Sequence, residues 1–293
     1  MLKNQYHTPK IIAEIGCNHK GNFQIAKELI QIAKNCRADY GKFQKRDNRS
    51  LLTEEQYDAP HPVPRNSYGD SYGDHREFLE FSQDQHAELK TYAESIGIGY
   101  ATSVWDEVSA REIVELQPDF IKVPSACNNN FAMLRLLRDT YGGDIHISTG
   151  MTTPTEIEAF VQLFEETGQA KDRLVIYNCT SGYPVPFRDI CLLEINRLYE
   201  QFGDRVQSIG FSGHHLGISV DIAAYTLGAH WIERHFTGDR TWKGTDHAAS
   251  LEEPGLRKLV RNLHQTCESL TYKPTEILDI EQPQRDKLKY RKV

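Results

Sequence analysis

Residues 10–44 read KIIAEIGCNHKGNFQIAKELIQIAKNCRADYGKFQ, and they predict a strand, a helix and a second strand in succession. Residues 10–16 and 38–44 are short apolar runs of the length and composition of buried strands. Residues 22–36 instead repeat their apolar side chains at helical spacing. Because parallel strands joined by helices are the unit of α/β folds, this stretch predicts an α/β protein.

The same alternation recurs as far as residue 270. Six more strand-like runs follow, at residues 98–104, 120–125, 144–150, 174–180, 208–213 and 230–236, and amphipathic segments such as 84–97 lie between them. Thr153, Pro154 and Glu156 together form the signature of a helix start. Eight strands alternating with helices predict a single-domain (β/α)₈ TIM barrel over residues 1–270, with a doubly wound open sheet as the alternative. Residues 271–293 are expected to form a polar C-terminal extension.

The whole-chain totals restrict the classes of protein that the sequence can encode. With 39% hydrophobic and 26% charged residues, the composition is that of a globular protein rather than a disordered one. The net charge of −7 argues against nucleic acid or an anionic membrane as the main partner. The first ten residues lack the apolar core of a signal peptide, and Asp221 and His230 interrupt the longest apolar stretch. We therefore expect small-molecule partners and no membrane association.

The cysteines are spread singly along the chain, without the CxxC spacing of a zinc site. This pattern is typical of reduced thiols in a cytoplasmic enzyme rather than of a disulfide framework. We expect them to be small core residues. Cys127 is the exception, and it is a candidate site residue because it falls just past a strand end among Ser125, Asn128 and Asn129.

Polar side chains gather where the predicted strands end. In a TIM barrel the active site lies at the C-terminal ends of the strands, so these side chains are expected to form one rim. Taken strand by strand, they are Glu14, Asn18 and His19; Lys42 and Gln44; Thr102 and Ser103; Lys122 and Ser125; Ser148 and Thr149; Asn178, Thr180 and Ser181; Ser212, His214 and His215; and Glu233 and His235. The non-periodic residues 46–80 would form a lid or a substrate wall above this rim.

His214 and His235 close two adjacent strands, so their imidazoles could converge on one metal ion. The alternative is that each is an ordinary hydrogen-bonded histidine. Carboxylates at Glu14 and Asp246 are available as further ligands, and such a mixed set would suit Mn²⁺, Mg²⁺, Fe²⁺ or Zn²⁺.

Lys42 and Lys122 are cations inside otherwise apolar strands. Lysine is almost never fully buried without a partner, so either the side chains reach solvent at the strand ends or they have a function. One function is a Schiff-base lysine, and the other is a site for an anion with several oxygens, such as phosphoenolpyruvate. Two lysines with hydroxyls nearby favour the anion site.

Two further features have less specific explanations. Glu233 and Arg234 are predicted to form an ion pair that orients His235, or to lie on the outer wall. The turn Ser148-Thr149-Gly150 could cradle a phosphate, although glycine turns after strands are common.

Taken together, these segments resemble the sialic acid synthase family, the phosphoenolpyruvate-condensing enzymes that make nonulosonic acids. The similar segments are AEIGCNHKGN (13–22), KFQK (42–45), YGDHREFLEFS (72–82), KVPSACNNN (122–130), ISTGM (147–151), CTSGYP (179–184), GFSGHH (210–215) and IERHFTGDRTWKGTDHAASLE (232–252). They cover residues 10–270 in the family's order, and the last is especially similar to the branch that includes animal sialic acid phosphate synthases. The family's catalytic domain is a (β/α)₈ barrel.

The resemblance implies a role for each matching residue. It implies that His214 and His235 bind a divalent metal, with Mn²⁺ expected and Mg²⁺ or Co²⁺ as alternatives. The residues on phosphoenolpyruvate-binding positions are Lys42, Thr102, Lys122, Ser125, Ser181 and Ser212. Gln44, Tyr183 and Asp246 match residues that face the acceptor sugar, and Glu14 matches an acid near the reaction centre. Glu14 and Asp246 are the predicted catalytic residues, which would move the proton of a water or a sugar hydroxyl.

The sequence departs from the family pattern at three points. Cys127 stands where relatives carry Glu or Asp, and His215 stands where they carry Thr or Glu, so a third imidazole could reach the metal or the substrate. Most members also carry a C-terminal antifreeze-like domain that lends an arginine to a partner's active site, and we expect none in this chain. Arg46, Arg49 and Arg65 are candidates to replace that cation, and a homo-oligomer is an open expectation.

The leading hypothesis is a metal-dependent transferase that condenses phosphoenolpyruvate with an aldose to give a 3-deoxy-2-ulosonic acid and phosphate. The default acceptor is N-acetylmannosamine or its 6-phosphate, and a non-N-acetylated or shorter sugar is the first alternative. A Schiff-base pyruvate lyase that uses Lys122 or Lys42, and a non-catalytic relative that binds the same ligands, are the others.

Overall fold

The computed structural model describes residues 6–290. Residues 1–5, within the segment that is expected to lack a signal peptide, and residues 291–293, within the expected polar extension, lie outside the described part. In residues 6–290 no helix combines the length and the apolar character needed to cross a membrane. The six cysteines are free thiols, as the sequence predicted. The expectation that they are core residues holds for Cys36 and is wrong for Cys191, which is exposed, and Cys17, Cys179 and Cys267 are only partly buried.

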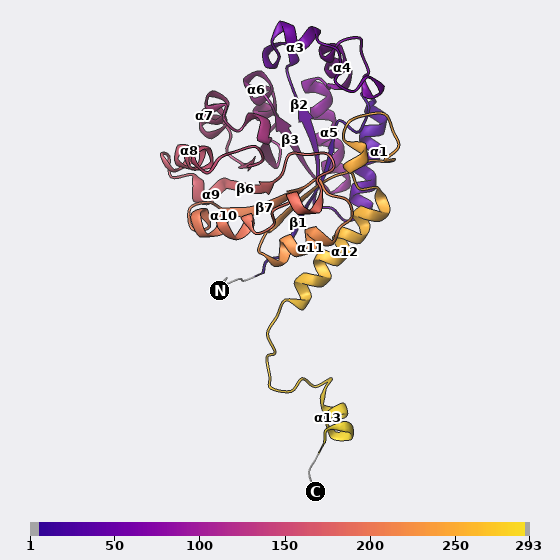
Figure 1. Cartoon of the computed structure of the whole chain (residues 1–293), viewed down its shortest axis with the longest axis vertical. Coiled ribbons are helices and arrows are strands. Elements are labelled where there is room, and N and C mark those ends of the chain that lie inside the picture. Colours follow the sequence, from indigo (N-terminus) through magenta and orange to yellow (C-terminus); the bar gives the residue numbers. More distant parts are fainter. Residues whose placement is uncertain (1–5, 291–293) are drawn as a thin grey trace.

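Eight parallel strands form a closed barrel in chain order (Figure 1). They are β1 (Lys10–Gly16), β2 (Tyr40–Lys45), β3 (Gly99–Val104), β4 (Phe120–Val123), β5 (Asp144–Ser148), β6 (Leu174–Cys179), β7 (Ser208–Gly213) and β8 (Trp231–His235). The first strand pairs with the last, and this pairing sets Glu14 beside His235. Closure confirms the predicted TIM barrel and excludes the open sheet.

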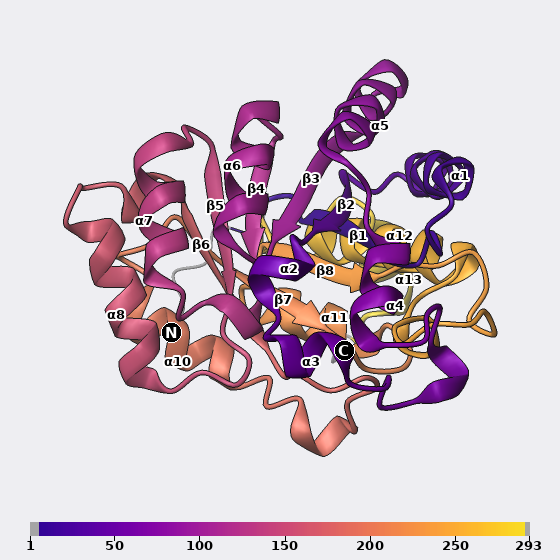
Figure 2. The same ribbon diagram turned by 90° about the horizontal axis from the view of Figure 1, so that it is seen from above.

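Helices lie around the outside of the strands (Figure 2). The main ones are α1 (Phe23–Asn35), α5 (Gln83–Ile96), α6 (Glu107–Leu116), α7 (Phe131–Thr140), α8 (Pro154–Glu165), α10 (Glu194–Phe202), α11 (Ser219–Thr226) and α12 (Glu253–Ser269). Shorter elements are α2 (Asn48–Leu51), α3 (Glu54–Asp58), η1 (Pro64–Asn66), α4 (Tyr72–Leu79), η2 (Ser125–Cys127), α9 (Ala170–Arg173), η3 (Phe187–Asp189) and η4 (His247–Ala249).

The predicted start of α8 is confirmed in detail. Thr153 caps the helix by accepting a bond from the backbone N–H of Glu156, and the Glu156 side chain accepts one from the backbone of Thr153 in return. Pro154 occupies the first turn, where its missing N–H costs nothing. Local sequence therefore fixes where the chain leaves β5 and begins its return.

Apolar side chains fill two regions of the barrel. The larger core lies between the strands and the helices. A smaller cluster fills the barrel's interior, formed by Ile12, Ala101, Phe120, Val175 and Tyr177. His146 stacks on Phe120 in this layer, with ring centroids 4.0 Å apart. Because this layer closes the interior, the polar residues further along each strand are displayed at the C-terminal end of the barrel.

The two segments outside the regular alternation behave differently. Residues 46–80 fold into α2, α3, η1 and α4, and Figure 1 shows α3 and α4 at the top of the molecule, above β2. After α12, residues 270–281 lead away from the barrel to the short helix α13 (Gln282–Leu288), which stands apart from it in Figure 1.

Candidate active site

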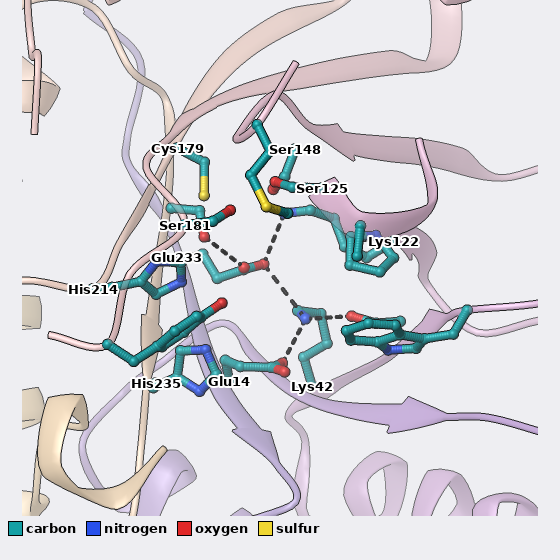
Figure 3. A pocket seen from close by; sticks show the side chains of 17 residues that line it. Glu14, Lys42, Lys122, Ser125, Ser148, Cys179, Ser181, His214, Glu233 and His235 are labelled. Carbon is teal, nitrogen blue, oxygen red and sulfur yellow. Dashed lines mark hydrogen bonds and ion pairs between the residues drawn. The ribbon is translucent and has the colours of Figure 1, made fainter. Parts of the chain in front are cut away.

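A cavity of about 320 Å³ opens at the C-terminal ends of the strands. All eight strands, or the residues directly after them, contribute to its lining (Figure 3). Nine of the twelve predicted site residues line it, namely Glu14, Lys42, Lys122, Ser125, Ser181, Tyr183, Ser212, His214 and His235. The predicted rim is therefore a real cluster of side chains in one pocket.

The floor of the pocket is a chain of alternating charges that runs Glu14–Lys42–Glu233–Lys122 (Figure 3). Lys42 Nζ lies 2.5 Å from Glu14 Oε2 and 3.6 Å from Glu233 Oε2. Lys122 Nζ lies 3.1 Å from the same Glu233 oxygen and 3.5 Å from the ring centre of Tyr177. All four charged side chains are at most 7% exposed. Burial of this kind is tolerated because each charge has a partner.

The pKa shifts follow from that arrangement. Burial is the largest influence on Glu14 and raises its pKa to about 6, against the opposing charge of Lys42. Burial also disfavours the charged form of Glu233, but Lys122 and Lys42 outweigh it and hold the pKa of Glu233 below its usual value. Burial lowers the pKa of Lys122, whereas Lys42, between two carboxylates, has its pKa raised despite burial.

Hydroxyl groups surround the two lysines. Ser212 donates to Glu233 Oε1 at 3.0 Å, and Lys42 donates to Ser103 Oγ at 2.7 Å. Ser125 and Ser181 converge above Gly150, whose backbone N–H donates to Ser125 at 3.0 Å. A side chain at Gly150 would stand 2.5 Å from the Ser181 hydroxyl, so only glycine permits this approach. The serines and lysines together offer donors from several directions to a multi-oxygen anion.

His214 and His235 face each other across the pocket, with ring centroids 5.3 Å apart. His214 Nδ1 donates to the Thr180 carbonyl at 3.0 Å, which leaves the Nε2 lone pair available. Burial lowers the pKa of His235, and its Nδ1 is a buried atom without a hydrogen-bond partner, 3.8 Å from Asp246 Oδ2. Neutral imidazoles with free lone pairs fit a divalent metal. Within residues 6–290 no group of three or more His, Cys, Asp or Glu side chains is arranged as a complete ligand set.

The remaining predicted contacts lie at the edge of the cavity. Tyr183 packs on His214, with ring centroids 4.3 Å apart. Gln44 does not line the cavity directly but donates to Glu14 Oε1 at 2.7 Å. Asp246 does not line the cavity either. It lies next to His235, with Oδ2 3.8 Å from His235 Nδ1.

Thr102 points away from the pocket, and Ser103 takes the place predicted for it. Adjacent residues on a strand face opposite sides, and the register pairs Ser103 with Gln44 on β2 and with Lys122 on β4. Thr102 is fully buried on the outer side, where its hydroxyl has no hydrogen-bond partner among residues 6–290.

The predicted ion pair between Glu233 and Arg234 is wrong for the same reason, and the alternative that they lie on the outer wall holds for Arg234 but not for Glu233. Glu233 points inward to the lysines, whereas Arg234 points outward and contacts Asp221 Oδ2 at 2.5 Å. His215 joins this outer network, with Nε2 3.1 Å from Arg234, so it does not line the cavity with His214 and His235. Glu233, Arg234 and His235 are consecutive residues of β8. Glu233 and His235 face the pocket, whereas Arg234 faces the outer side of the barrel.

Trp105, Met151 and Cys179 line the cavity but were not singled out from the sequence. Ser103, which the sequence placed on the rim without assigning it a role, lines the cavity as well. Burial opposes ionisation of the Cys179 thiol, but His214 and Lys122 nonetheless lower its pKa. Cys179 could have been found by alternation, because it shares a face with the pocket residue Ser212 on the neighbouring strand.

Cys127 and the candidate arginines have distinct surroundings. Cys127 is buried beneath the cavity wall, and burial raises the pKa of its thiol to about 11. Arg46 stacks on the pocket residue Trp105, with its guanidinium carbon 3.8 Å from the ring centre. Arg49 instead lies over Tyr57, and Arg65 is exposed.

Comparison with known proteins agrees with this geometry. Residues 29–274 match the model of the NeuB family. The chain is 38% identical to N-acetylneuraminate-9-phosphate synthase of Homo sapiens over 282 residues, which cover 96% of this chain and 77% of that protein. It is 32% identical over 255 residues to N,N'-diacetyllegionaminic acid synthase of Campylobacter jejuni, covering 87% of this chain and 75% of that protein.

The fold is also similar to a solved enzyme. The crystal structure of N-acetylneuraminic acid synthetase from Leptospira borgpetersenii, in complex with citrate, superposes with a TM-score of 0.80 and 26% identity, covering 99% of this chain and 97% of that one. The extent of these matches confirms the predicted class of enzyme, a transferase of the sialic acid synthase type. The chain belongs to the NeuB family.

Proposed function

We propose that this enzyme condenses phosphoenolpyruvate with the aldehyde of an aldose, with Mn²⁺ as the metal, to give a 3-deoxy-2-ulosonic acid and phosphate. The observation that carries the proposal is the buried chain of two lysines and two carboxylates beside a pair of facing histidines. Two cations with several hydroxyl donors fit the carboxylate and phosphate of phosphoenolpyruvate. Facing imidazoles fit a divalent metal.

Lys42 and Lys122 would hold the anionic substrate in a fixed position. The serine hydroxyls of the pocket complete its hydrogen bonds, which orients carbon 3 toward the acceptor. Both lysines are paired with carboxylates, and an amine in that state is protonated and a poor nucleophile. This pairing favours anion binding over the Schiff-base alternative.

His214 and His235 would hold the divalent ion. A metal bound there supplies a Lewis acid for the aldehyde oxygen of the acceptor. With two imidazoles holding it, the ion would be able to bind substrate oxygens as well.

The reaction needs one water and at least one proton acceptor. Carbon 3 of phosphoenolpyruvate bonds to the aldehyde carbon, water adds to the resulting cation at carbon 2, and the tetrahedral intermediate loses phosphate by C–O cleavage. Glu14 is the residue we assign to take the proton from water, because burial raises its pKa to about 6 and Gln44 and Lys42 fix its two oxygens. Asp246, which faces His235, is assigned to the sugar side.

N-acetylmannosamine or its 6-phosphate is the proposed acceptor. The name of the human relative refers to a 9-phosphate product, and that of the Campylobacter relative to a different sugar acid. Cys127, in place of an acidic residue, makes a non-N-acetylated or shorter sugar the alternative.

The test is to incubate the purified chain with phosphoenolpyruvate, Mn²⁺ and a panel of aldoses, following phosphate release and product mass. Turnover with one aldose and a product mass equal to the sum of both substrates plus water minus phosphoric acid would support the proposal. Borohydride trapping of a pyruvate adduct, with no phosphate release from any member of the panel, would replace it with the Schiff-base reaction.

A further inference from the structure

A second cavity, of about 290 Å³, lies where the ends of β7 and β8 meet the start of α12. The turn after β7, residues 215–218, forms one wall, and residues 249–252, directly before α12, form another. Three cations line it, namely Arg234, Arg240 and Lys258. Among the described residues, none lines both this cavity and the catalytic one. We call it the outer cavity.

Arg234 is the buried cation of the outer cavity. It is 1% exposed, and its two terminal nitrogens donate to Asp221 Oδ2, to the Gly217 carbonyl at 2.8 Å and to the His215 carbonyl at 2.6 Å. Its Nε is buried and has no hydrogen-bond partner among residues 6–290. A buried donor without an acceptor costs free energy, so this nitrogen is a group that a bound molecule can satisfy.

Arg240 and Lys258 extend the positive charge from Arg234 to the surface. Both are exposed, and Arg240 donates from Nε and Nη2 to the Ala248 carbonyl rather than to a carboxylate. Against the three cations stand two carboxylates, Glu252 in the lining and Asp221 beside Arg234. Three positive charges and two negative ones leave an excess of one positive charge, which favours an anion.

The first turn of α12 adds to this preference. Glu252, Pro254 and Gly255 line the outer cavity, so a helix of 17 residues begins there. Glu252, at the N-cap position, does not cap the helix with its side chain, since its Oε1 accepts a bond from the backbone N–H of Arg240 at 2.9 Å. The unpaired N–H groups and partial positive charge of a helix start attract the oxygens of an anion.

The remaining lining is largely apolar. Leu216, Ile218 and Leu251 lie in the two walls, and Leu216 is 46% exposed. A bare ion would leave this apolar surface in contact with water, whereas an organic molecule would cover it. The volume is close to the lower end of what small-molecule sites in proteins have. The outer cavity therefore fits a small molecule with an anionic end and an apolar part.

The outer cavity adjoins the catalytic one through the backbone. His215 directly follows His214, and Arg234 directly precedes His235. In the other wall, the backbone N–H of Leu251 donates to the His235 carbonyl at 2.8 Å. A molecule in the outer cavity would thus contact the neighbours of both histidines without touching the substrates.

We propose that the outer cavity is a second binding site of this protein, for a small organic anion that carries a phosphate or a carboxylate beside an apolar part. The anionic end lies between Arg240, Lys258 and the first turn of α12, where guanidinium and ammonium groups can both donate to its oxygens. The apolar part lies against Leu216 and Leu251. Because this site is separate from the catalytic cavity, its occupant is an effector rather than a substrate.

Calorimetric titration of the full chain measures the binding. The probes are phenyl phosphate, benzoate and inorganic phosphate, so that the phosphate, the carboxylate and the bare ion are compared. We expect phenyl phosphate or benzoate to bind at least about tenfold more tightly than inorganic phosphate, and the tighter of the two identifies the anionic group. Inorganic phosphate that binds as tightly as both would overturn the assignment to an organic anion.

Two double variants test the residues. Arg240→Met/Lys258→Met should weaken binding of the tighter probe at least about tenfold. Arg257→Met/Arg261→Met is the matched control, because it removes the same charge from α12 and its neighbourhood but changes residues that line a different cavity, and it should keep the wild-type affinity. Melting curves verify that both variants fold. Unchanged affinity in Arg240→Met/Lys258→Met, or an equal loss in the two double variants, would overturn the proposal.

A crystal structure of the full chain with the tighter probe locates the bound molecule. Density against Arg240 and Lys258 would support the proposal, and density confined to the catalytic cavity would overturn it. No substrate is present in these measurements, so the result does not depend on the proposed condensation. Binding in the outer cavity without turnover of any aldose would sink the condensation alone, and turnover without this binding would sink the second site alone.

Discussion

Glu233 Oε2 lies 3.1 Å from Lys122 Nζ, and this contact joins two strands on opposite sides of the barrel. Glu233 also accepts a hydrogen bond from Ser212 and lies 3.6 Å from Lys42. One carboxylate therefore keeps two buried lysines charged and in place before any substrate arrives. The sequence placed Glu233 on the rim without a role, and these contacts show that it organises both lysines of the pocket.

Glu233→Gln is expected to lower kcat/KM for phosphoenolpyruvate by about 100-fold. The amide cannot neutralise Lys122, whose pKa burial already lowers, so the anion loses a cation in its site. Glu112→Gln is the matched control, because Glu112 pairs with Lys45 at 3.1 Å on the outer side and should change the rate by less than about twofold. Steady-state kinetics of both variants decide the matter, and an unchanged Glu233→Gln enzyme would show that the lysines do not depend on this carboxylate.

Ser103→Ala and Thr102→Val test the assignment of faces on β3. Ser103 accepts a bond from Lys42 in the pocket, so its loss should raise KM for phosphoenolpyruvate by about three- to tenfold. The Thr102 hydroxyl is buried without a partner, so Thr102→Val should leave kinetics unchanged and keep or raise the melting temperature. The reverse pattern, with Thr102→Val impaired and Ser103→Ala normal, would contradict the placement.

Metal removal should abolish activity and Mn²⁺ should restore it. His214→Ala and His235→Ala should each lose bound metal, measured as metal content per chain, because the protein offers only these facing imidazoles in the described pocket. His215→Asn is the control and should retain metal, since His215 contacts Arg234 on the outer side. Loss of metal in His215→Asn with retention in His214→Ala would reverse the assignment.

A buried histidine predicts a pH dependence of stability. His86 is fully buried with Nδ1 2.6 Å from the Tyr100 hydroxyl, and burial, followed by the charges of Lys45 and His19, lowers its pKa to about 3. Between the ordinary value of 6.5 and about 3, the unfolded chain binds a proton that the folded chain does not. The free energy of unfolding should therefore fall as pH falls, by about 1.4 kcal/mol per pH unit from this residue.

Denaturant unfolding between pH 7 and pH 5 measures that slope. The double variant His86→Phe/Tyr100→Phe removes both partners of the buried bond and should reduce the slope by about one proton. Tyr100→Phe alone should keep the wild-type slope. An unchanged slope in the double variant would mean that His86 is protonated in the folded state.

The sequence predicted the strands well because each is a short apolar run between helix signals. The run at 10–16 coincides with β1, and the run at 230–236 exceeds β8 by one residue at each end. The run at 120–125 was too long, since Pro124 cannot donate to the sheet and β4 ends at Val123. The number of strands predicted that the barrel closes, whereas the register between neighbouring strands could not be predicted from the sequence.

The candidate site was predictable to the level of strand ends but not always to the correct face. Alternation says that Thr102 and Ser103 point to opposite sides, and only the register with Lys122 on β4 says which one enters the pocket. For Glu233 and Arg234 the same rule would have excluded the expected ion pair from sequence alone. The approach of Arg46 and Arg76 to Glu80 required the structure, because it joins the end of β2 to α4.

The alternation along β8 has a consequence for how this protein can change. Substitutions at Glu233 or His235 alter the pocket, and substitutions at Arg234 alter the outer network, so point changes act on one face at a time. Insertion or deletion of a single residue before Glu233 would instead exchange the two faces, directing Arg234 into the barrel and both pocket residues out of it. Length variation among functional homologues is therefore expected in the loops on either side of β8, and not within the strand.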